Sequence, residues 1–159
     1  MIRVGMGEYA IARAPGELSA LGLGSCVGVC LYDPVEKLGC LAHVMLPDSR
    51  AAKDDTNPVK FADTAIPFLL REMARQGAEI GRLEVKIVGG AQMFGSMGGH
   101  NGKEPIGARN VAAILNALSA AGLRPVASSV GGNAGKSIIL DLERGELRLR
   151  TLQLDASVL

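Results

Sequence analysis

The sequence alternates short β-type runs with turn signals and interrupts them with two helical stretches. Before residue 48, the runs "IRVG", "EYAIAR", "CVGVCLY" and "GCLAHVML" are rich in β-branched or alternating apolar residues. Later runs are "RLEVKIV", "RPVASSV" and the pair "SIILDL" and "ELRLRTL", which residues 143–145 predict to be a hairpin. This order predicts an α/β fold with a mixed, largely antiparallel sheet and two main helices.

Two segments carry apolar residues at helical spacing. The first helix begins either near Asn57, which suits a helix cap, or later, near Asp63. Pro67 would kink a helix that starts at the earlier position, and the sequence leaves both starts open. The second helix is predicted over about residues 107–121, ended by Gly122.

Length and composition exclude several classes of protein. A chain of 159 residues with 48% hydrophobic residues is expected to form a single domain over residues 1–159, with a real core. The net charge of +1 lacks the basic footprint that nucleic acid requires, and the scarce aromatic residues argue against a base-stacking platform. We expect no nucleic-acid partner and, when the protein is free, a monomer.

The same reasoning bears on the membrane, the compartment and metals. The longest uncharged run, residues 18–32, is too short and too rich in glycine to span a bilayer, so no membrane insertion is expected. Three cysteines without a secretion signal indicate reduced thiols in the cytoplasm. Because Cys26, Cys30 and Cys40 form no metal-ligand pattern, no metal is expected.

The stretch "SALGLGSCVGVCLYDP", followed by "HVMLP", suggests a cysteine nucleophile, Cys26, with a histidine base, His43. A hairpin whose turn is residues 33–36 would set these two residues directly opposite each other, with Cβ atoms about 4.5–5.5 Å apart. A turn two residues longer gives a diagonal pair at about 7–8 Å, and an odd change separates them onto opposite faces. The alternative is that both are ordinary core residues.

The residues before Cys26 suit acyl-transfer chemistry. Gly24 and its neighbouring glycine allow close approach of the backbone to a ligand. The amides of Ser25 and Cys26 are candidates for stabilising an oxyanion. A thiol beside an imidazole is expected to be a thiolate at neutral pH.

Six ordered motifs, "GLGSCVGVCLYDP", "HVMLPDS", "KFADTAIPFLL", "GGAQMF", "IGARNV" and "GGNAGKS", together resemble the chemoreceptor glutamine deamidases, the CheD family of bacterial chemotaxis. The resemblance covers almost the whole chain and implies an α/β sandwich. It also implies hydrolysis of selected glutamine side chains on the cytoplasmic helices of chemoreceptors to glutamate. Cys26 lies at the family's cysteine and His43 at its histidine, whereas the family's threonine is replaced by Ala20.

The resemblance implies a mechanism through a Cys26 thioester, with weak glutamyl methylesterase activity as a corollary and with no metal or organic cofactor. Because alanine has no hydroxyl to orient the imidazole, we expect a backbone carbonyl to replace it. Ser19 would point to the other face of the strand.

Two glycine-rich segments that follow strands, residues 89–95 and 131–133, are expected to form the rim of the site. Candidate substrate-binding side chains there and on the second helix are Gln92, Met93, Phe94, Asn110 and Asn133. Met93 and Phe94 are either exposed apolar anchors for a helical partner or core residues under a loop. Asn110 either holds a carboxamide or only caps its helix.

Other functions are weaker or remain open. "GGNAGKS" is not a P-loop, because Val130 stands where the first glycine belongs and strands follow. The main alternative to the enzyme is a binding module that docks on a receptor or on a chemotaxis phosphatase of the CheC type. A general cysteine amidase acting on small amides is a third possibility.

Overall fold

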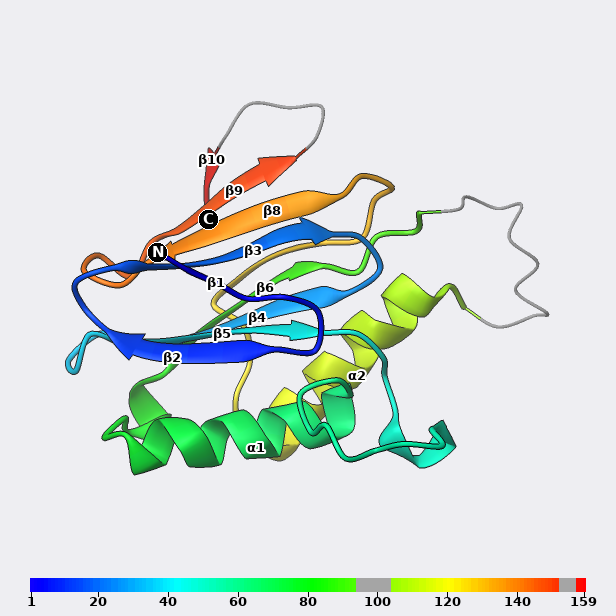
Figure 1. Ribbon diagram of the computed structural model, residues 1–159, viewed down its shortest axis with the longest axis horizontal. Helices are drawn as coiled ribbons and strands as arrows, with labels where there is room; N and C mark the ends of the chain where they lie inside the picture. The colour runs from blue at the N-terminus through cyan, green and yellow to red at the C-terminus, as the bar shows by residue number, and fades with distance from the viewer. Residues whose placement is uncertain (94–103, 152–156) are drawn as a thin grey trace.

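The computed structural model describes residues 1–93, 104–151 and 157–159, which form three layers (Figure 1). Two β-sheets stack face to face, and two helices cover the outer face of one of them. The strands of the uncovered sheet, in spatial order, are β1 (Ile2–Arg3), β3 (Glu17–Leu23), β8 (Lys136–Asp141), β9 (Leu147–Thr151) and β10 (Ser157–Val158). Those of the helix-covered sheet are β2 (Tyr9–Arg13), β5 (Leu38–Val44), β4 (Val27–Asp33), β6 (Glu84–Gly89) and β7 (Ala127–Val130).

The predicted fold class, an α/β sandwich with mixed and largely antiparallel pairing, is confirmed. Only the pairs β1–β3 and β6–β7 are parallel among the strand pairs of the described chain. The predicted hairpin of β8 and β9 is present, with Gly145 in the left-handed region of its turn. β3 was not predicted as a separate strand, and neither was the division into two sheets.

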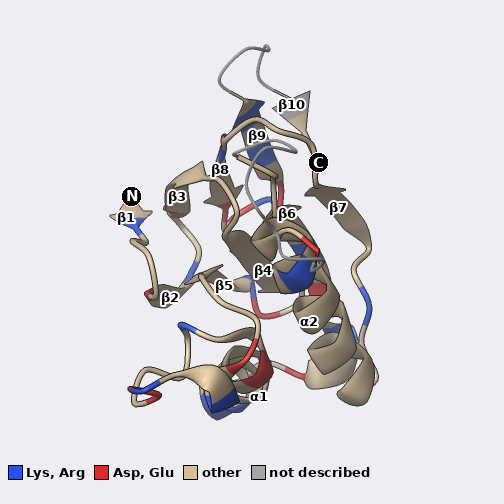
Figure 2. Ribbon diagram, turned by 90° about the vertical axis from the view of Figure 1, so that its right-hand side faces the viewer, with Lys and Arg blue, Asp and Glu red and all other residues tan. Residues whose placement is uncertain are grey.

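The helices α1 (Ala62–Arg75) and α2 (Ile106–Ala120) lie side by side under the sheet of β4 and β5 (Figure 2). α1 begins at the later of its two predicted starts. Asn57 caps no helix. Its side-chain oxygen accepts a hydrogen bond from the amide of Val59, and its side-chain nitrogen donates one to the carbonyl of Gly7. Two short 3-10 turns, Ser49–Ala51 and Ile80–Arg82, complete the helical elements of the described chain. None of its helices has the length and hydropathy to cross a bilayer.

The central strands β4 and β5 are buried along their whole length between two apolar clusters. Val27, Val29 and Leu31 face the helices, together with Ala42 and Val44 of β5. The alternate residues of the same strands face the other sheet, in a cluster that also includes β3 and β8. Because side chains alternate along a strand, successive positions of β4 and β5 face the helices and the other sheet in turn.

The register of β4 against β5 differs from the predicted one by two residues. Gly28, not Cys26, lies opposite His43, and Asp33 pairs with Leu38 as the last pair before the turn. The predicted turn began at Asp33, whereas the observed turn is residues 34–37, with Lys37 in the left-handed region. The directly opposed pairing of Cys26 and His43 is therefore wrong, and the diagonal pairing takes its place.

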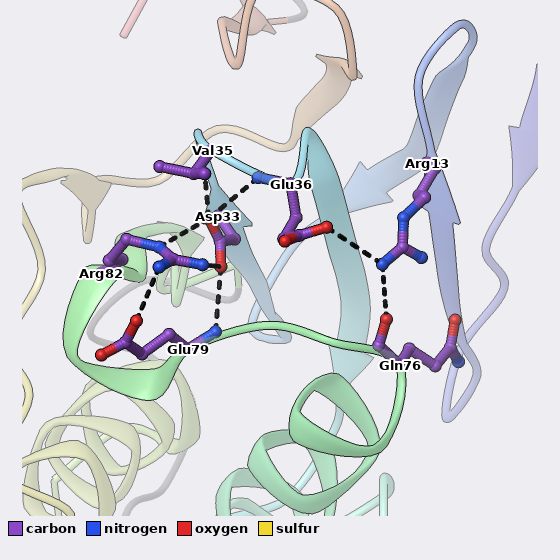
Figure 3. Close-up of polar contacts among 7 residues, drawn as sticks. All are labelled: Arg13, Asp33, Val35, Glu36, Gln76, Glu79 and Arg82. Atoms are coloured by element: carbon purple, nitrogen blue, oxygen red, sulfur yellow. Dashed lines mark hydrogen bonds and ion pairs between the residues drawn. The ribbon is translucent and has the colours of Figure 1, made fainter.

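The Asp33 carboxylate explains why the strand extends one residue further. It accepts hydrogen bonds from the amides of Val35 and Glu36 within the turn, at 3.0 and 3.2 Å. It also accepts one from the amide of Glu79 at 2.9 Å and pairs with Arg82 at 2.9 Å (Figure 3). Burial alone would raise the pKa of Asp33, but these hydrogen bonds outweigh it and hold the pKa well below its usual range.

Candidate active site

Cys26 lies directly before β4, at the end of the sandwich where the chain crosses from one sheet to the other. Its side chain is partly exposed and packs against the cluster between the sheets. Its carbonyl accepts a hydrogen bond from the amide of Gly90 at 2.8 Å. Cys30 and Cys40, by contrast, are fully buried core thiols. Cys26 is therefore the one thiol of the three with access to a substrate.

Gly89 makes this position of Cys26 possible. Its φ of +116° lies in a region that side chains rarely adopt, and an added Cβ would stand 2.2 Å from the carbonyl oxygen of Cys26. Gly90 and Gly107 have a similar relation to each other, because a Cβ on Gly107 would lie 2.5 Å from the oxygen of Gly90. The glycines thus let the end of β6 approach both the start of α2 and residues 24–26, which we call the nucleophile segment.

His43 lies on the same face of the sheet as Cys26. Gly28 is its direct partner on β4, and Cys26 precedes Gly28 by two residues. Continuing the register, Cys26 is the diagonal neighbour of His43, a relation in which an imidazole can still reach the other side chain, with about 7–8 Å between the two positions. The predicted sharing of one face thus holds even though the turn was misplaced.

The His43 side chain is buried, with 3% of the residue exposed. The main chain of His43 is fixed by the N-terminal segment: its amide donates to the carbonyl of Glu8 at 3.0 Å, and its carbonyl accepts from Gly7 at 2.9 Å. Neither ring nitrogen has a hydrogen-bond partner of standard geometry in the part of the chain that is described. The ring can therefore still take up a proton at one of its nitrogens.

Burial lowers the pKa of His43, and the main chain of Val4 and the charge of Glu8 oppose this only in part. Burial also raises the pKa of the Cys26 thiol. The amide N–H of the same residue lowers that pKa, but by less. The directions of both shifts favour a thiol and a neutral imidazole over the expected preformed thiolate, because both side chains lose solvation in their charged forms.

Asn110 holds the nucleophile segment from the side of α2. Its side chain is fully buried on α2, and the amide nitrogen donates to the carbonyls of Ser25 at 2.9 Å and Met45 at 3.0 Å. The prediction that Asn110 binds a substrate carboxamide is wrong, because a side chain with no exposed surface cannot reach another protein. It is a positioning residue.

The hydrogen bond from Asn110 to Ser25 also determines where the amide N–H of Cys26 points. The carbonyl of Ser25 and the N–H of Cys26 belong to one planar trans peptide group, in which they point in opposite directions. With the carbonyl held by Asn110, the Cys26 N–H points away from α2. This agrees with the effect of that N–H on the thiol of its own residue, whose thiolate form it favours. The N–H of Cys26 thus lies near its own sulfur and favours negative charge there.

Asn110→Ala is expected to lower the free energy of unfolding by about 2 kcal/mol, because it leaves two partly buried carbonyls without this donor. Asn116→Ala is the matched control, since Asn116 lies exposed on the same helix and should change the stability little. Chemical denaturation of both variants measures the difference. Equal stability of the two variants would contradict the assigned role of Asn110.

The rim residues lie close to the nucleophile segment through main-chain contacts. The amide of Gln92 donates to Gly132, and the amide of Gly131 donates to Gly89, both at 2.9 Å. Asn133, next to Gly132, is exposed. Met93 is 44% exposed and packs on Gly24, since a Cβ on that glycine would lie 3.1 Å from its Cγ. Phe94 lies outside the described residues.

The position of the family's threonine is apolar here. Ala20 is fully buried on β3, within the cluster between the sheets. Ser19, its neighbour, is also buried, but it is not part of that cluster, and its hydroxyl has no partner in the described chain. The main chain of Val4 acts on the imidazole instead. It raises the pKa of His43, as an acceptor of the ring N–H does.

Comparison with known proteins places the chain in a family. A family model described as CheD chemotactic sensory transduction matches residues 45–151. A probable chemoreceptor glutamine deamidase CheD of Syntrophomonas wolfei is 46% identical over 152 residues, covering 96% of this chain and 94% of the relative. The chemoreceptor glutamine deamidase CheD of Thermotoga maritima is 48% identical over 147 residues, covering 92% and 89%. The probable deamidase of Pyrococcus abyssi is 44% identical over 149 residues, covering 94% and 90%. The chain therefore belongs to the CheD family.

Proposed function

We propose that the protein hydrolyses glutamine side chains on the cytoplasmic helices of chemoreceptors to glutamate, with Cys26 as nucleophile and His43 as base. The observation that carries this proposal is one partly exposed thiol on the same strand face as a buried imidazole, whose nitrogens make no hydrogen bond of standard geometry with the described residues. The names of the relatives support the choice of substrate.

The first half of the proposed reaction forms a thioester. Neutral His43 takes the proton of the Cys26 thiol as the sulfur attacks the carboxamide carbon of glutamine. The Cys26 amide, and the neighbouring amide of Ser25, donate to the oxygen that becomes negative. The protonated imidazole then gives its proton to the departing nitrogen, so that the C–N bond breaks and ammonia leaves.

The second half hydrolyses the thioester. His43, neutral again, takes a proton from a water molecule that attacks the acyl carbon, and the C–S bond breaks to release glutamate. Cys26 recovers its proton from the imidazole. A glutamate methyl ester would give the same thioester with loss of methanol, so weak methylesterase activity belongs to this proposal. No step needs a cofactor.

The imidazole must hold its orientation during both halves. We propose that a main-chain carbonyl at Val4 takes the place of the missing hydroxyl at Ala20, because the main chain of Val4 favours the protonated ring. Val4 is itself buried, and its amide donates to the carbonyl of Ser19 at 2.7 Å, so its position is fixed.

A chemoreceptor cytoplasmic fragment tests the proposed substrate. Incubation with the protein should release ammonia and convert specific glutamines to glutamate, both measurable by a coupled ammonia assay and by peptide mass spectrometry. Free glutamine and short amides should give no turnover. Turnover of the small amides instead would indicate a general cysteine amidase. Ammonia at the level of the fragment alone would leave a binding module that docks on the receptor or on a CheC-type phosphatase.

A further inference from the structure

A pocket of about 370 Å³ opens beside the candidate active site, at the segment that joins β7 to β8. Its lining consists of residues 130–134 together with Lys136 and Thr151. None of the proposed chemical steps uses this pocket. It contains a cation, an exposed amide side chain and a buried hydroxyl, which together point to an anionic ligand.

The pocket lies at the same end of the sandwich as Cys26. Lys136, the first residue of β8, pairs with Leu23 on one side and with Thr151 on the other. Leu23 faces the space between the sheets and precedes Cys26 by only three residues. Because directly paired residues share a face, the Lys136 and Thr151 side chains also project toward this space.

The main chain joins the pocket to the nucleophile segment. The carbonyl of Gly132 accepts the amide of Gln92, and the amide of Gly131 reaches Gly89, the glycine in contact with Cys26. The pocket lining is thus joined by one main-chain hydrogen bond to the glycine that contacts Cys26. This arrangement suits a second part of the same substrate.

Polar groups of the pocket can still donate hydrogen bonds to a ligand. The Lys136 ammonium donates to the carbonyl and hydroxyl oxygens of Ser129, at 3.1 and 2.9 Å, which accounts for two of its three protons. No carboxylate of the described chain forms an ion pair with it. The Thr151 hydroxyl is buried and has no partner within the described residues. Burial lowers the pKa of Lys136, and a bound anion would offset that effect.

We propose that this pocket binds a carboxylate of the substrate helix, carried by a glutamate or aspartate one helical turn from the target glutamine. Residues three or four apart on a helix lie on one face, with Cβ atoms about 5–6 Å apart, so both side chains can enter neighbouring sites together. Lys136 supplies the charge, and the exposed Asn133 supplies a neutral hydrogen-bonding group. The proposal rests on the proposed function and names the sequence context that the enzyme selects.

Two matched receptor fragments and two variants test the carboxylate pocket. One fragment keeps the acidic residues within one turn of the modified glutamine, and the other has them replaced by glutamine or asparagine. With the acidic fragment, Lys136→Gln should raise KM about tenfold and leave kcat nearly unchanged, because one charge-assisted contact is lost. Lys136→Arg should restore most of the loss. With the neutral fragment, the wild type should already show the higher KM, and Lys136→Gln should add nothing.

Ser129→Ala is the structural control, because it removes a hydrogen bond of the ammonium but keeps the charge. It should leave the preference for the acidic fragment in place. An equal effect of Lys136→Gln on both fragments, or a loss of stability without any change of KM, would overturn the carboxylate pocket. Turnover of either fragment by the wild type shows that the proposed deamidation itself stands, so the two failures are distinguishable.

Discussion

Cys26→Ala is expected to reduce ammonia release from a chemoreceptor fragment by about a thousandfold or more, to the background level. The variant removes the only atom that can form the acyl intermediate. Because Cys26 is partly exposed and lies outside the strands, the free energy of unfolding should change by less than about 1 kcal/mol. The measurement is the rate of ammonia release beside a denaturation curve.

Cys30→Ala is the matched control for this prediction. Cys30 carries the same functional group, four residues further along the chain, and is fully buried, with its pKa raised to about 12. Its replacement should cost about 1 kcal/mol of stability through a small cavity and leave the activity of the folded protein intact. An active Cys26→Ala, or an inactive but folded Cys30→Ala, would contradict the assignment of the nucleophile.

Gly89→Ala should have the largest effect on stability, about 3 kcal/mol or more, and should also remove activity. The new Cβ would stand 2.2 Å from the Cys26 carbonyl oxygen, and the φ of +116° is strained for any side chain. The backbone of β6 or of the nucleophile segment must therefore shift. Thermal or chemical unfolding gives the stability, and alkylation of Cys26 followed by mass spectrometry reports the change at the thiol.

Gly81→Ala makes the same chemical change at an open position. No atom lies within 4 Å of an added Cβ on Gly81, and its φ is not in the positive region. This variant should retain wild-type stability and activity. If Gly89→Ala matched it in both, the close approach of Gly89 to Cys26 would not be needed for the site.

The sequence predicted that Cys26 and His43 share a face, because side-chain alternation in strands is a local and rigid property. It misplaced the pairing by two residues, because the end of the turn depends on Asp33. That carboxylate is fixed by Arg82, which lies 49 residues further along the chain. A shift of two residues preserves the face, so the predicted sharing of one face by Cys26 and His43 survived the error in the turn.

Long-range contacts also explain the other differences. Asn57 has the composition of a helix cap, yet its side chain bonds to Gly7, 50 residues earlier, and the helix begins five residues later. β3 pairs with β8, more than 100 residues away, so nothing near it in the sequence marks it as part of a second sheet.

Asn110 was recognised as a candidate site residue but given the wrong role. Its two acceptors, Ser25 and Met45, are 85 and 65 residues distant, and only the folded chain brings them to one side chain. Lys136 entered the sequence analysis only within the motif "GGNAGKS", with no role of its own. Its isolated charge became visible once β8 was placed beside the nucleophile segment.

The pH dependence of kcat/KM for ammonia release, in the wild type and in His43→Gln, tests the central claim most directly. A base works only when it is unprotonated, and burial lowers the pKa of His43. Wild-type activity should therefore fall only below the ordinary histidine value of about 6.5 and stay level through neutral pH. His43→Gln should be much less active and should climb toward alkaline pH, as the Cys26 thiol with its raised pKa ionises unaided. A His43→Gln variant that keeps the rate and acid limb of the wild type would contradict the account.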